Sequence, residues 1–277
     1  MDIRPIVEAE AYGKSRVRLV KVVRHPDRHD LKELTVNILL RGDFETCYTE
    51  GDNSKVLPTD TMKNTVYVLA QDTCAATPEL FAQHLVRHFL DDNPQVSSVE
   101  IAITEHLWSR IDRYTFEQRG PELRTTTVNG DRYKTTVVSG IDDLVLLKTT
   151  KSSFEGYIKD KYTTLPETSD RILATALRAT WKYSDPDVPF DTIWHAIRKS
   201  MVEAFAGHES KSVQHTLYAV GERVLDTFPQ VGEIEMAMPN KHCLLVDLAR
   251  FGLENKNEIF VPVDEPHGYI KARLVRG

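Results

Sequence analysis

Apolar and polar positions begin to alternate early in the chain. Between residues 33 and 40 every second residue is Leu, Val or Ile, and the residues between them are mostly polar. A period of two predicts a half-buried β-strand. The valine-rich run 16–23 ends at a His-Pro-Asp turn signal, so the two runs together predict an antiparallel hairpin.

Two helical segments follow this hairpin. The first covers residues 61–69, and the second begins after Thr77, with Phe81, Leu85 and Phe89 recurring every four residues on one face. Thr77 precedes a proline and is therefore the predicted N-cap of the second helix.

Strand character returns at residues 99–103, where Val and Ile alternate with other residues. Further along, Asn129-Gly130 is the dipeptide most typical of a tight hairpin turn and predicts one there. The first half of the chain is therefore predicted to contain two strands, two helices and two strands.

The second half repeats this order. Strands are predicted at 144–150 and 172–183, two helices come next, and strands follow at 231–238 and 242–248. The apolar helix faces consist of Ile193, Ile197, Met201 and Phe205 in the first helix and Val213, Leu217, Val220 and Val224 in the second. Paired helices between hairpins favour an α+β fold with antiparallel sheets over a doubly wound parallel one.

The 277 residues are enough for two domains, and the repeated order predicts domains at 1–139 and 140–277. Each would be an antiparallel β-sheet with paired helices on one face. The uncovered face of such a sheet needs a partner, and four chains could close their sheets into a barrel. We therefore expect a homo-oligomer.

Composition narrows the function classes. The chain carries 35 Lys and Arg against 41 Asp and Glu, a formal net charge of -6, without a long basic run, which argues against nucleic acid as a partner. Its start does not resemble a signal peptide, and no apolar run approaches the ~20 residues of a membrane span. Cys47, Cys74 and Cys243 are an odd number of separated thiols, which suggests a reducing compartment and assigns none of them a role.

Familiar cofactor motifs are missing from the sequence. No G-x-G-x-x-G, phosphate loop or G-x-S-x-G occurs, which argues against dinucleotide, nucleoside triphosphate and nucleophilic-serine chemistry. His84 and His88 stand four apart on a predicted helix, but no Glu follows His84 as a zincin motif requires. We interpret them as residues of a solvated helix face.

One long segment carries a specific resemblance. Residues 144–154 read Leu-Val-Leu-Leu-Lys-Thr-Thr-Lys-Ser-Ser-Phe, and Tyr157, Tyr-Thr-Thr-Leu at 162–165 and Glu-Thr-Ser-Asp-Arg at 167–171 follow. This run resembles the signature of urate oxidases. Shorter blocks occur in the order the family has them: Tyr12-Gly13-Lys14, Thr59-Asp60-Thr61-Met62-Lys63-Asn64, Ser212-Val213-Gln214 and Pro239-Asn240-Lys241-His242.

The resemblance implies two tandem tunnelling-fold (T-fold) domains, a homotetramer built around an oligomeric β-barrel, and active sites at subunit interfaces. It also implies cofactor-independent oxidation of urate by O2, the co-substrate, to 5-hydroxyisourate and hydrogen peroxide in purine degradation. No metal is then required. Eukaryotic members commonly end in a peroxisomal tripeptide, whereas this chain ends Leu-Val-Arg-Gly, so we expect a cytoplasmic enzyme.

Substrate contacts are implied at matched positions. Phe154 would stack on the flat purine, the planar fork of Arg171 would hold its anionic edge, and Gln214 would bind the opposite edge. Backbone N–H groups of Val213 and Asp60 would add hydrogen bonds.

A proton relay is likewise implied. Lys14 would polarise the hydroxyl of Thr59, which contacts a water or oxygen species above the purine, and His242 would pass the proton on. Asn240 would complete the oxygen pocket. Thr59 follows Pro58 at a predicted helix start and could also act as its cap. One chain would supply Thr59 and Asp60, and its neighbour Phe154, Arg171, Gln214 and Asn240.

Two alternatives stay open at this point. A zinc-dependent pterin or folate-pathway enzyme of the same fold would bind a related heterocycle, but it needs clustered His or Cys ligands, and here the histidines are scattered. A catalytically inactive purine-binding relative would keep the fold and lose the chemistry.

Overall fold

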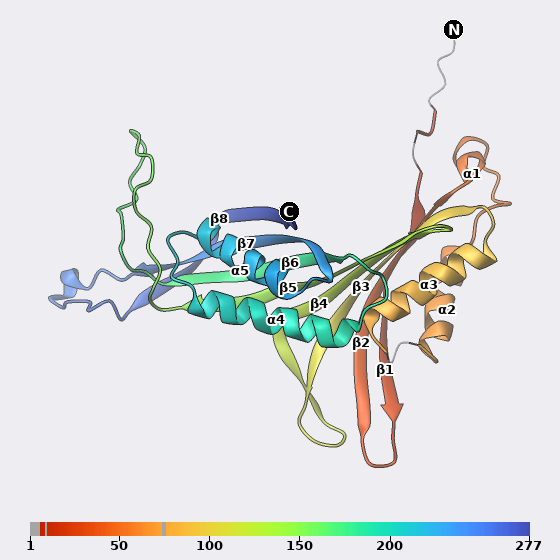
Figure 1. The fold of residues 1–277 in the computed structure, drawn as a ribbon, viewed down its shortest axis with the longest axis horizontal. Helices are drawn as coiled ribbons and strands as arrows, with labels where there is room; N and C mark the ends of the chain where they lie inside the picture. Colours follow the sequence, from red (N-terminus) through yellow and green to blue (C-terminus); the bar gives the residue numbers. More distant parts are fainter. Residues whose placement is uncertain (1–5, 9, 74–75) are drawn as a thin grey trace, which may run out of the picture. The chain divides into compact units, whose positions relative to one another are not determined.

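The computed structural model describes residues 6–8, 10–73 and 76–277. Its strands β1 to β8 neighbour one another in sequence order, with helices between the hairpins (Figure 1). The chain forms two compact units, unit 1 with Met1–Gly140 and Asp185–Asp191, and unit 2 with Ile141–Ser184 and Thr192–Gly277. The predicted α+β class with antiparallel sheets is confirmed.

Unit 1 opens with the predicted hairpin. β1 (Tyr12–Arg24) pairs antiparallel with β2 (His29–Gly42). The alternating apolar residues of β2 are buried, from Leu34 to Leu40, because they lie on the face that the helices cover. The period of two therefore identified the core face of this strand.

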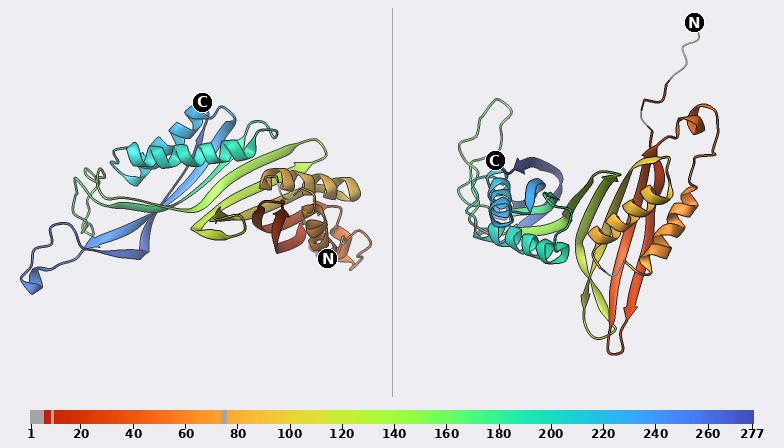
Figure 2. Two further views of the ribbon diagram at one scale, coloured as in Figure 1. Left: turned by 90° about the horizontal axis from the view of Figure 1, so that it is seen from below. Right: turned by 45° about the vertical axis from the view of Figure 1, so that its right-hand side comes forward.

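Helices α2 (Thr59–Ala70) and α3 (Pro78–Asp92) confirm both predicted helices of unit 1. The hydroxyl oxygen of Thr77 accepts a hydrogen bond from the Leu80 N–H at 3.3 Å, so the predicted N-cap is also confirmed. Both helices lie over one face of the unit 1 strands (Figure 2). A short helix α1 (Glu45–Thr49) was not predicted. None of the helices in the described residues is long and apolar enough to cross a membrane.

The predicted turn at Asn129-Gly130 is wrong. Both residues lie within β4 (Phe116–Asp131), paired with Glu100 and Val99 of β3 (Val96–Arg110). The turn into β5 (Thr135–Lys148) comes later, because the Asp131 carboxylate accepts the N–H groups of residues 133 and 134 at 2.7 and 2.8 Å. Gly130 instead allows α3 to pack closely against β4, since a Cβ at this position would come 2.5 Å from the Val86 side chain.

A buried ionic network joins α3 to the sheet of unit 1. Glu79 is 0% exposed and Arg124 is 3% exposed, and their side chains are 2.9 Å apart. Arg124 also donates to Asp191 at 2.7 Å, while Glu79 accepts from Thr126 at 3.1 Å and Ser139 at 2.5 Å. Several hydrogen bonds thus compensate each buried charge, as burial requires.

Unit 2 repeats the arrangement. β6 (Leu173–Tyr183) is followed by α4 (Phe190–Gly207) and α5 (Val213–Thr227), whose apolar faces are buried as predicted. Both helices lie over the strands of this unit (Figure 2).

The last predicted hairpin is wrong. Residues 231–238 and 242–248 were expected as two strands, but β7 (Val231–Leu245) runs through Pro239, and the short helix η1 (Ala249–Phe251) follows it. The partner strand is β8 (Phe260–Val275), with Pro239 opposite Tyr269. Two prolines and a glycine within β8 are turn signals in sequence, and they concealed that strand.

Among the cysteines, Cys47 and Cys243 are free thiols, each partly exposed. Cys74 lies outside the described residues.

Candidate functional site

Lys14 lies in β1 at a point where the strand is irregular. The register with β2 shifts between Lys14 and Val17, and Arg16 adopts a positive φ of 59°. Just before Lys14, a Cβ on Gly13 would come 1.8 Å from the Ile38 carbonyl oxygen, so only glycine allows β1 to approach β2 this closely. β-Bulges are common beside functional residues because they redirect side chains.

Thr59 and Asp60 begin α2, which packs against β1. The N-cap is Pro58 and makes no side-chain cap bond, so the interpretation of Thr59 as the cap is wrong. Thr59 is instead the first helical residue, where a backbone N–H lacks a partner within the helix. Its hydroxyl is therefore not needed as the helix cap.

The charge of Asp60 is stabilised locally. The pKa of the Asp60 carboxyl is lowered mainly by Lys63, through a hydrogen bond and through its charge. A hydrogen bond from the Asn64 amide at 3.2 Å lowers this pKa further, and the charge of Lys14 makes the smallest contribution. The first cluster, in unit 1, thus consists of Thr59 and Asp60 at the start of α2 and of Lys14 on β1, the strand against which α2 packs.

A second cluster, in unit 2, forms around the backbone of Ser152. The Ser152 carbonyl accepts the Arg171 N–H at 2.7 Å, and Ser153 N–H donates to the Ser210 carbonyl at 2.8 Å. Residues 152 and 154 also form isolated bridges to 210 and 168. Three segments far apart in sequence therefore meet here, and they carry Phe154, Arg171 and the start of α5.

Phe154 and Arg171 lie beside each other in this cluster. The guanidinium carbon of Arg171 is 5.2 Å from the centroid of the Phe154 ring. Tyr157 stacks on Phe154, with centroids 4.8 Å apart and an interplanar angle of 14°. Phe154 therefore has Tyr157 stacked on one face, and the guanidinium of Arg171 also lies over its ring.

Arg171 is a partly buried cation, and within the described residues it forms no ion pair. Burial lowers the pKa of its guanidinium, and its Nε is buried without a hydrogen-bond partner. The hydroxyl oxygens of Ser152 and Thr175 are likewise buried and unpartnered among the described residues. Buried polar groups are normally satisfied, so such a group marks a place for a ligand or water.

The amino end of α5 adds hydrogen-bond donors to the same cluster. Val213 is buried and Gln214 is exposed, and they are the first two helical residues. The N-cap Ser212 accepts from the His215 N–H at 3.1 Å, whereas the first N–H groups of a helix have no intrahelical partners. Together with the helix dipole, these groups favour an anion.

Asn240 and His242 lie two residues apart in β7, the spacing that places side chains on one face of a strand. The register with β8 shifts between them. Asn240 also pairs with Thr175 of β6, four residues after Arg171, so β7 lies beside the segment that carries Arg171. His242 is thus inside a strand and not at the start of one.

The structure therefore divides the predicted residues into two clusters. Unit 1 holds Lys14, Thr59 and Asp60; unit 2 holds the others. Sequence reasoning gave no role to Ser152, whose backbone joins the segments, or to Tyr157, whose ring covers Phe154. The Tyr157 position three residues after Phe154 was visible in sequence, but only the fold shows that the rings stack.

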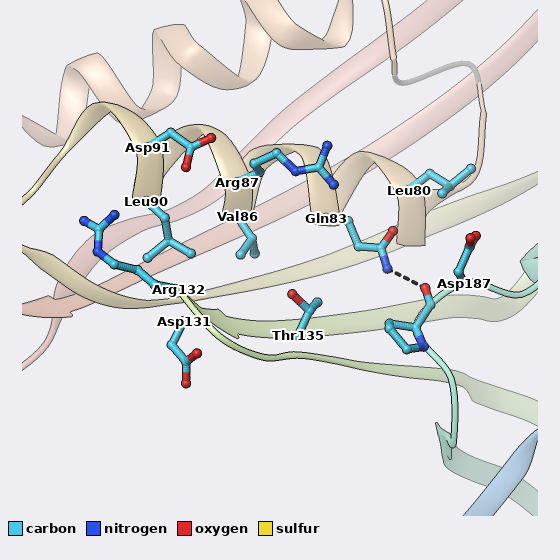
Figure 3. A pocket seen from close by; sticks show the side chains of 11 residues that line it. Leu80, Gln83, Val86, Arg87, Leu90, Asp91, Asp131, Arg132, Thr135 and Asp187 are labelled. Atoms are coloured by element: carbon cyan, nitrogen blue, oxygen red, sulfur yellow. Dashed lines mark hydrogen bonds between the residues drawn. The ribbon is translucent and has the colours of Figure 1, made fainter.

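A cavity of about 650 Å³ in unit 1 lies elsewhere (Figure 3). It is lined by residues of α3, by the turn after β4 and by residues 186–187, including Arg87 and Arg132, and Gln83 donates to the Pro186 carbonyl at 2.6 Å. It contains none of the predicted site residues, and its lining mixes both signs of charge. Within the described part of the chain, no group of three or more His, Cys, Asp or Glu is placed to hold a metal ion.

Comparison with known proteins gives consistent results. The uricase family model matches residues 10–136 and 137–271, once in each half. Uricase from Arthrobacter globiformis is 43% identical over 267 residues, covering 96% of this chain and 88% of that protein. Its crystal structure superimposes with a TM-score of 0.96 at 42% identity, covering 99% of this chain and 96% of that one. Uricase from Dictyostelium discoideum is 41% identical, and 96% of each chain is covered.

Proposed function

Because the chain belongs to the uricase family, we propose that it oxidises urate with O2 and water to 5-hydroxyisourate and hydrogen peroxide. Each half is a T-fold domain, and we place the boundary between residues 139 and 140. The zinc-dependent pterin alternative finds no support, since the matched relatives are uricases.

Arg171 carries this proposal. A partly buried guanidinium without a carboxylate partner among the described residues, beside an aromatic face and the amino end of a helix, suits a flat anion. Urate is such an anion. Arg171 would hold its anionic edge and Phe154 its face, while Gln214 and the Val213 N–H would bind the opposite edge.

The chemistry divides between the two clusters. Urate is electron-rich enough to reduce O2 itself once deprotonated, so we propose a reaction without metal or flavin. Lys14 would polarise the Thr59 hydroxyl, Thr59 would contact the water or oxygen species above the ring, and His242 would pass the proton on. Asn240 would hold the oxygen or water, and the Asp60 N–H would bind the purine.

We propose further that the enzyme is a cytoplasmic homotetramer with sites at subunit interfaces. In each site, Thr59 and Asp60 would come from one chain, and Phe154, Arg171, Gln214 and Asn240 from its neighbour. The exposed apolar side chains of β8 and of the loop before it support an assembly, because such surfaces are normally covered.

The first experiment is to mix the purified protein with urate and oxygen and to follow urate absorbance and hydrogen peroxide. We expect equal amounts of urate consumed and peroxide formed. A verified tetramer that consumes no urate would be an inactive purine-binding relative, and the proposal would fail. One tightly bound zinc per chain would instead favour the pterin enzyme.

Arg171→Gln should raise KM for urate about 10- to 100-fold, the loss of roughly 1.5–3 kcal/mol for hydrogen bonds to a charged group. Steady-state kinetics measure this directly. Arg178→Gln is the matched control, because Arg178 is exposed and forms an ion pair with Asp142 on the surface. Equal KM values for the two variants would remove Arg171 from the binding site.

Coexpression of Thr59→Ala and Arg171→Ala chains should restore activity that neither variant has alone. If each site combines two chains, roughly a quarter of the sites in randomly mixed oligomers receive both wild-type residues. Activity per site, measured after separation of the mixed oligomers, checks this. No recovery in verified mixed tetramers would place Thr59 and Arg171 of each site on the same chain.

A further inference from the structure

The hydroxyl of Tyr12 binds the backbone of Leu57 at two points. It accepts a hydrogen bond from the Leu57 N–H at 2.8 Å and donates one to the Leu57 carbonyl at 3.2 Å. Tyr12 stands two residues before Lys14 in β1, and Leu57 stands two residues before Thr59. From this geometry we propose that Tyr12 is a positioning residue that holds Thr59 beside Lys14, an inference that rests on the proposed uricase function.

The ring of Tyr12 is itself fixed. It packs edge-on against Phe44, with centroids 4.8 Å apart and an interplanar angle of 89°, and Phe44 is 0% exposed. Burial raises the pKa of the Tyr12 hydroxyl, more than the hydrogen bond with Leu57 lowers it. The hydroxyl therefore stays neutral at working pH and can donate and accept at once.

The strand that carries Tyr12 also lies close against its neighbouring strand. Gly13 allows the backbone of β1 to lie against Ile38 of β2, and Tyr12 and Lys14 pair with Leu40 and Ile38 of that strand. Residues two apart in a strand share a face, so the Tyr12 hydroxyl and the Lys14 side chain project from the same side of β1.

The segment that leads to Thr59 has little regular structure of its own. Residues 51–58 form neither helix nor strand. Upstream, the Lys55 carbonyl accepts from Gln95 at 2.9 Å, and the Lys55 ammonium pairs with Asp43 at 2.5 Å. Leu57 stands directly before Pro58 and Thr59, so its two bonds to Tyr12 tie the segment that leads into α2 to the strand that carries Lys14.

Tyr12→Phe removes the hydroxyl and keeps the ring against Phe44. We expect kcat for urate to fall about tenfold, because small displacements of a reacting group cost large factors in rate. KM for urate should change little, since most purine contacts come from the unit 2 cluster. Two controls accompany it in α2: Tyr67→Phe removes an exposed tyrosine's hydroxyl, and Val66→Ala weakens the packing of the helix.

A double-mutant cycle with Thr59→Ala separates positioning from general destabilisation. If Tyr12 acts through Thr59, Tyr12→Phe should leave kcat unchanged in the Thr59→Ala background. Hydrogen exchange of the wild-type protein should also show a protected Leu57 amide. Three results would each overturn the inference. The kcat losses of Tyr12→Phe and Thr59→Ala could multiply in the double variant, the Leu57 amide could exchange freely, or Val66→Ala could show the same tenfold loss in kcat.

Urate consumption by the wild-type protein distinguishes a failure of the proposed function from a failure of the proposed role of Tyr12. If it consumes urate and Tyr12→Phe retains full kcat, only the role of Tyr12 is wrong. A wild-type tetramer that consumes no urate overturns the proposed function and, with it, this inference.

Discussion

Replacing Lys14 with methionine should lower kcat for urate oxidation by about 10²- to 10⁴-fold, the contribution typical of a positioned proton-transfer group. Methionine keeps much of the length and apolar stem of lysine but removes its positive charge. Thr59 has no intrinsic basicity, so in the proposed relay its hydroxyl would lose the group that polarises it. KM should stay close to the wild-type value, because the proposed purine contacts of Arg171 and Phe154 are unchanged. Stopped-flow or steady-state urate absorbance measures both constants.

Lys21→Met is the matched control. Lys21 lies in the same strand, and its ammonium binds the Gln71 carbonyl at the far end of α2, so this substitution removes the same charge away from Thr59. Thr59→Ala should match Lys14→Met in kcat, and the double variant should be little worse than either, because the two residues act as a unit in the proposed relay. The relay is wrong if Thr59→Ala turns over normally or if Lys21→Met loses as much activity as Lys14→Met.

Arg124→Met should destabilise unit 1 by about 3–5 kcal/mol, the cost of leaving one member of a buried ion pair without its partner. Glu79 is fully buried, and of its partners among the described residues the hydroxyl groups of Thr126 and Ser139 would remain to face its carboxylate. Methionine fills a similar volume, so the loss should arise from charge and not from a cavity. The free energy of unfolding from urea titrations of the variant and the wild type gives the number.

Arg178→Met tests whether burial is the cause. Arg178 binds Asp142 through two nitrogen atoms, at 2.9 and 2.7 Å, yet its side chain is 61% exposed. An exposed pair contributes about 0–1 kcal/mol. Glu79→Gln added to Arg124→Met should recover part of the stability, because it removes the uncompensated charge. Equal losses in Arg124→Met and Arg178→Met would contradict the argument from burial.

Most helices and strands could be predicted from sequence because their signals are local. The alternation along β2 and the cap at Thr77 each depend on residues only a few positions apart in the sequence. The wrong predictions concern segments whose structure depends on contacts with residues far away in the sequence. Gly130 is required by Val86 of α3, more than forty positions away in sequence, and β7 continues through Pro239 because β8 pairs alongside it.

The family and the candidate residues were also accessible from sequence, through blocks of matching residues whose order along the chain is itself information. The environment of those residues was not. That Arg171 is partly buried beside Phe154, with no ion-pair partner in the part of the chain that the structure describes, depends on backbone bonds joining residues 152, 171 and 210. That Thr59 is free from capping depends on Pro58 taking the cap position.

The sequence by itself thus determined the class of fold, most of its helices and strands, and which residues are candidates for the chemistry. Periodicity, caps and the order of motifs can all be recognised in the amino-acid sequence without knowledge of the fold. Only the tertiary structure decided how these residues group, that Tyr12 binds Leu57, and that Arg171 lacks a counter-charge among the described residues. Burial and hydrogen-bond partners are set by segments far apart in the chain, and no local pattern records them.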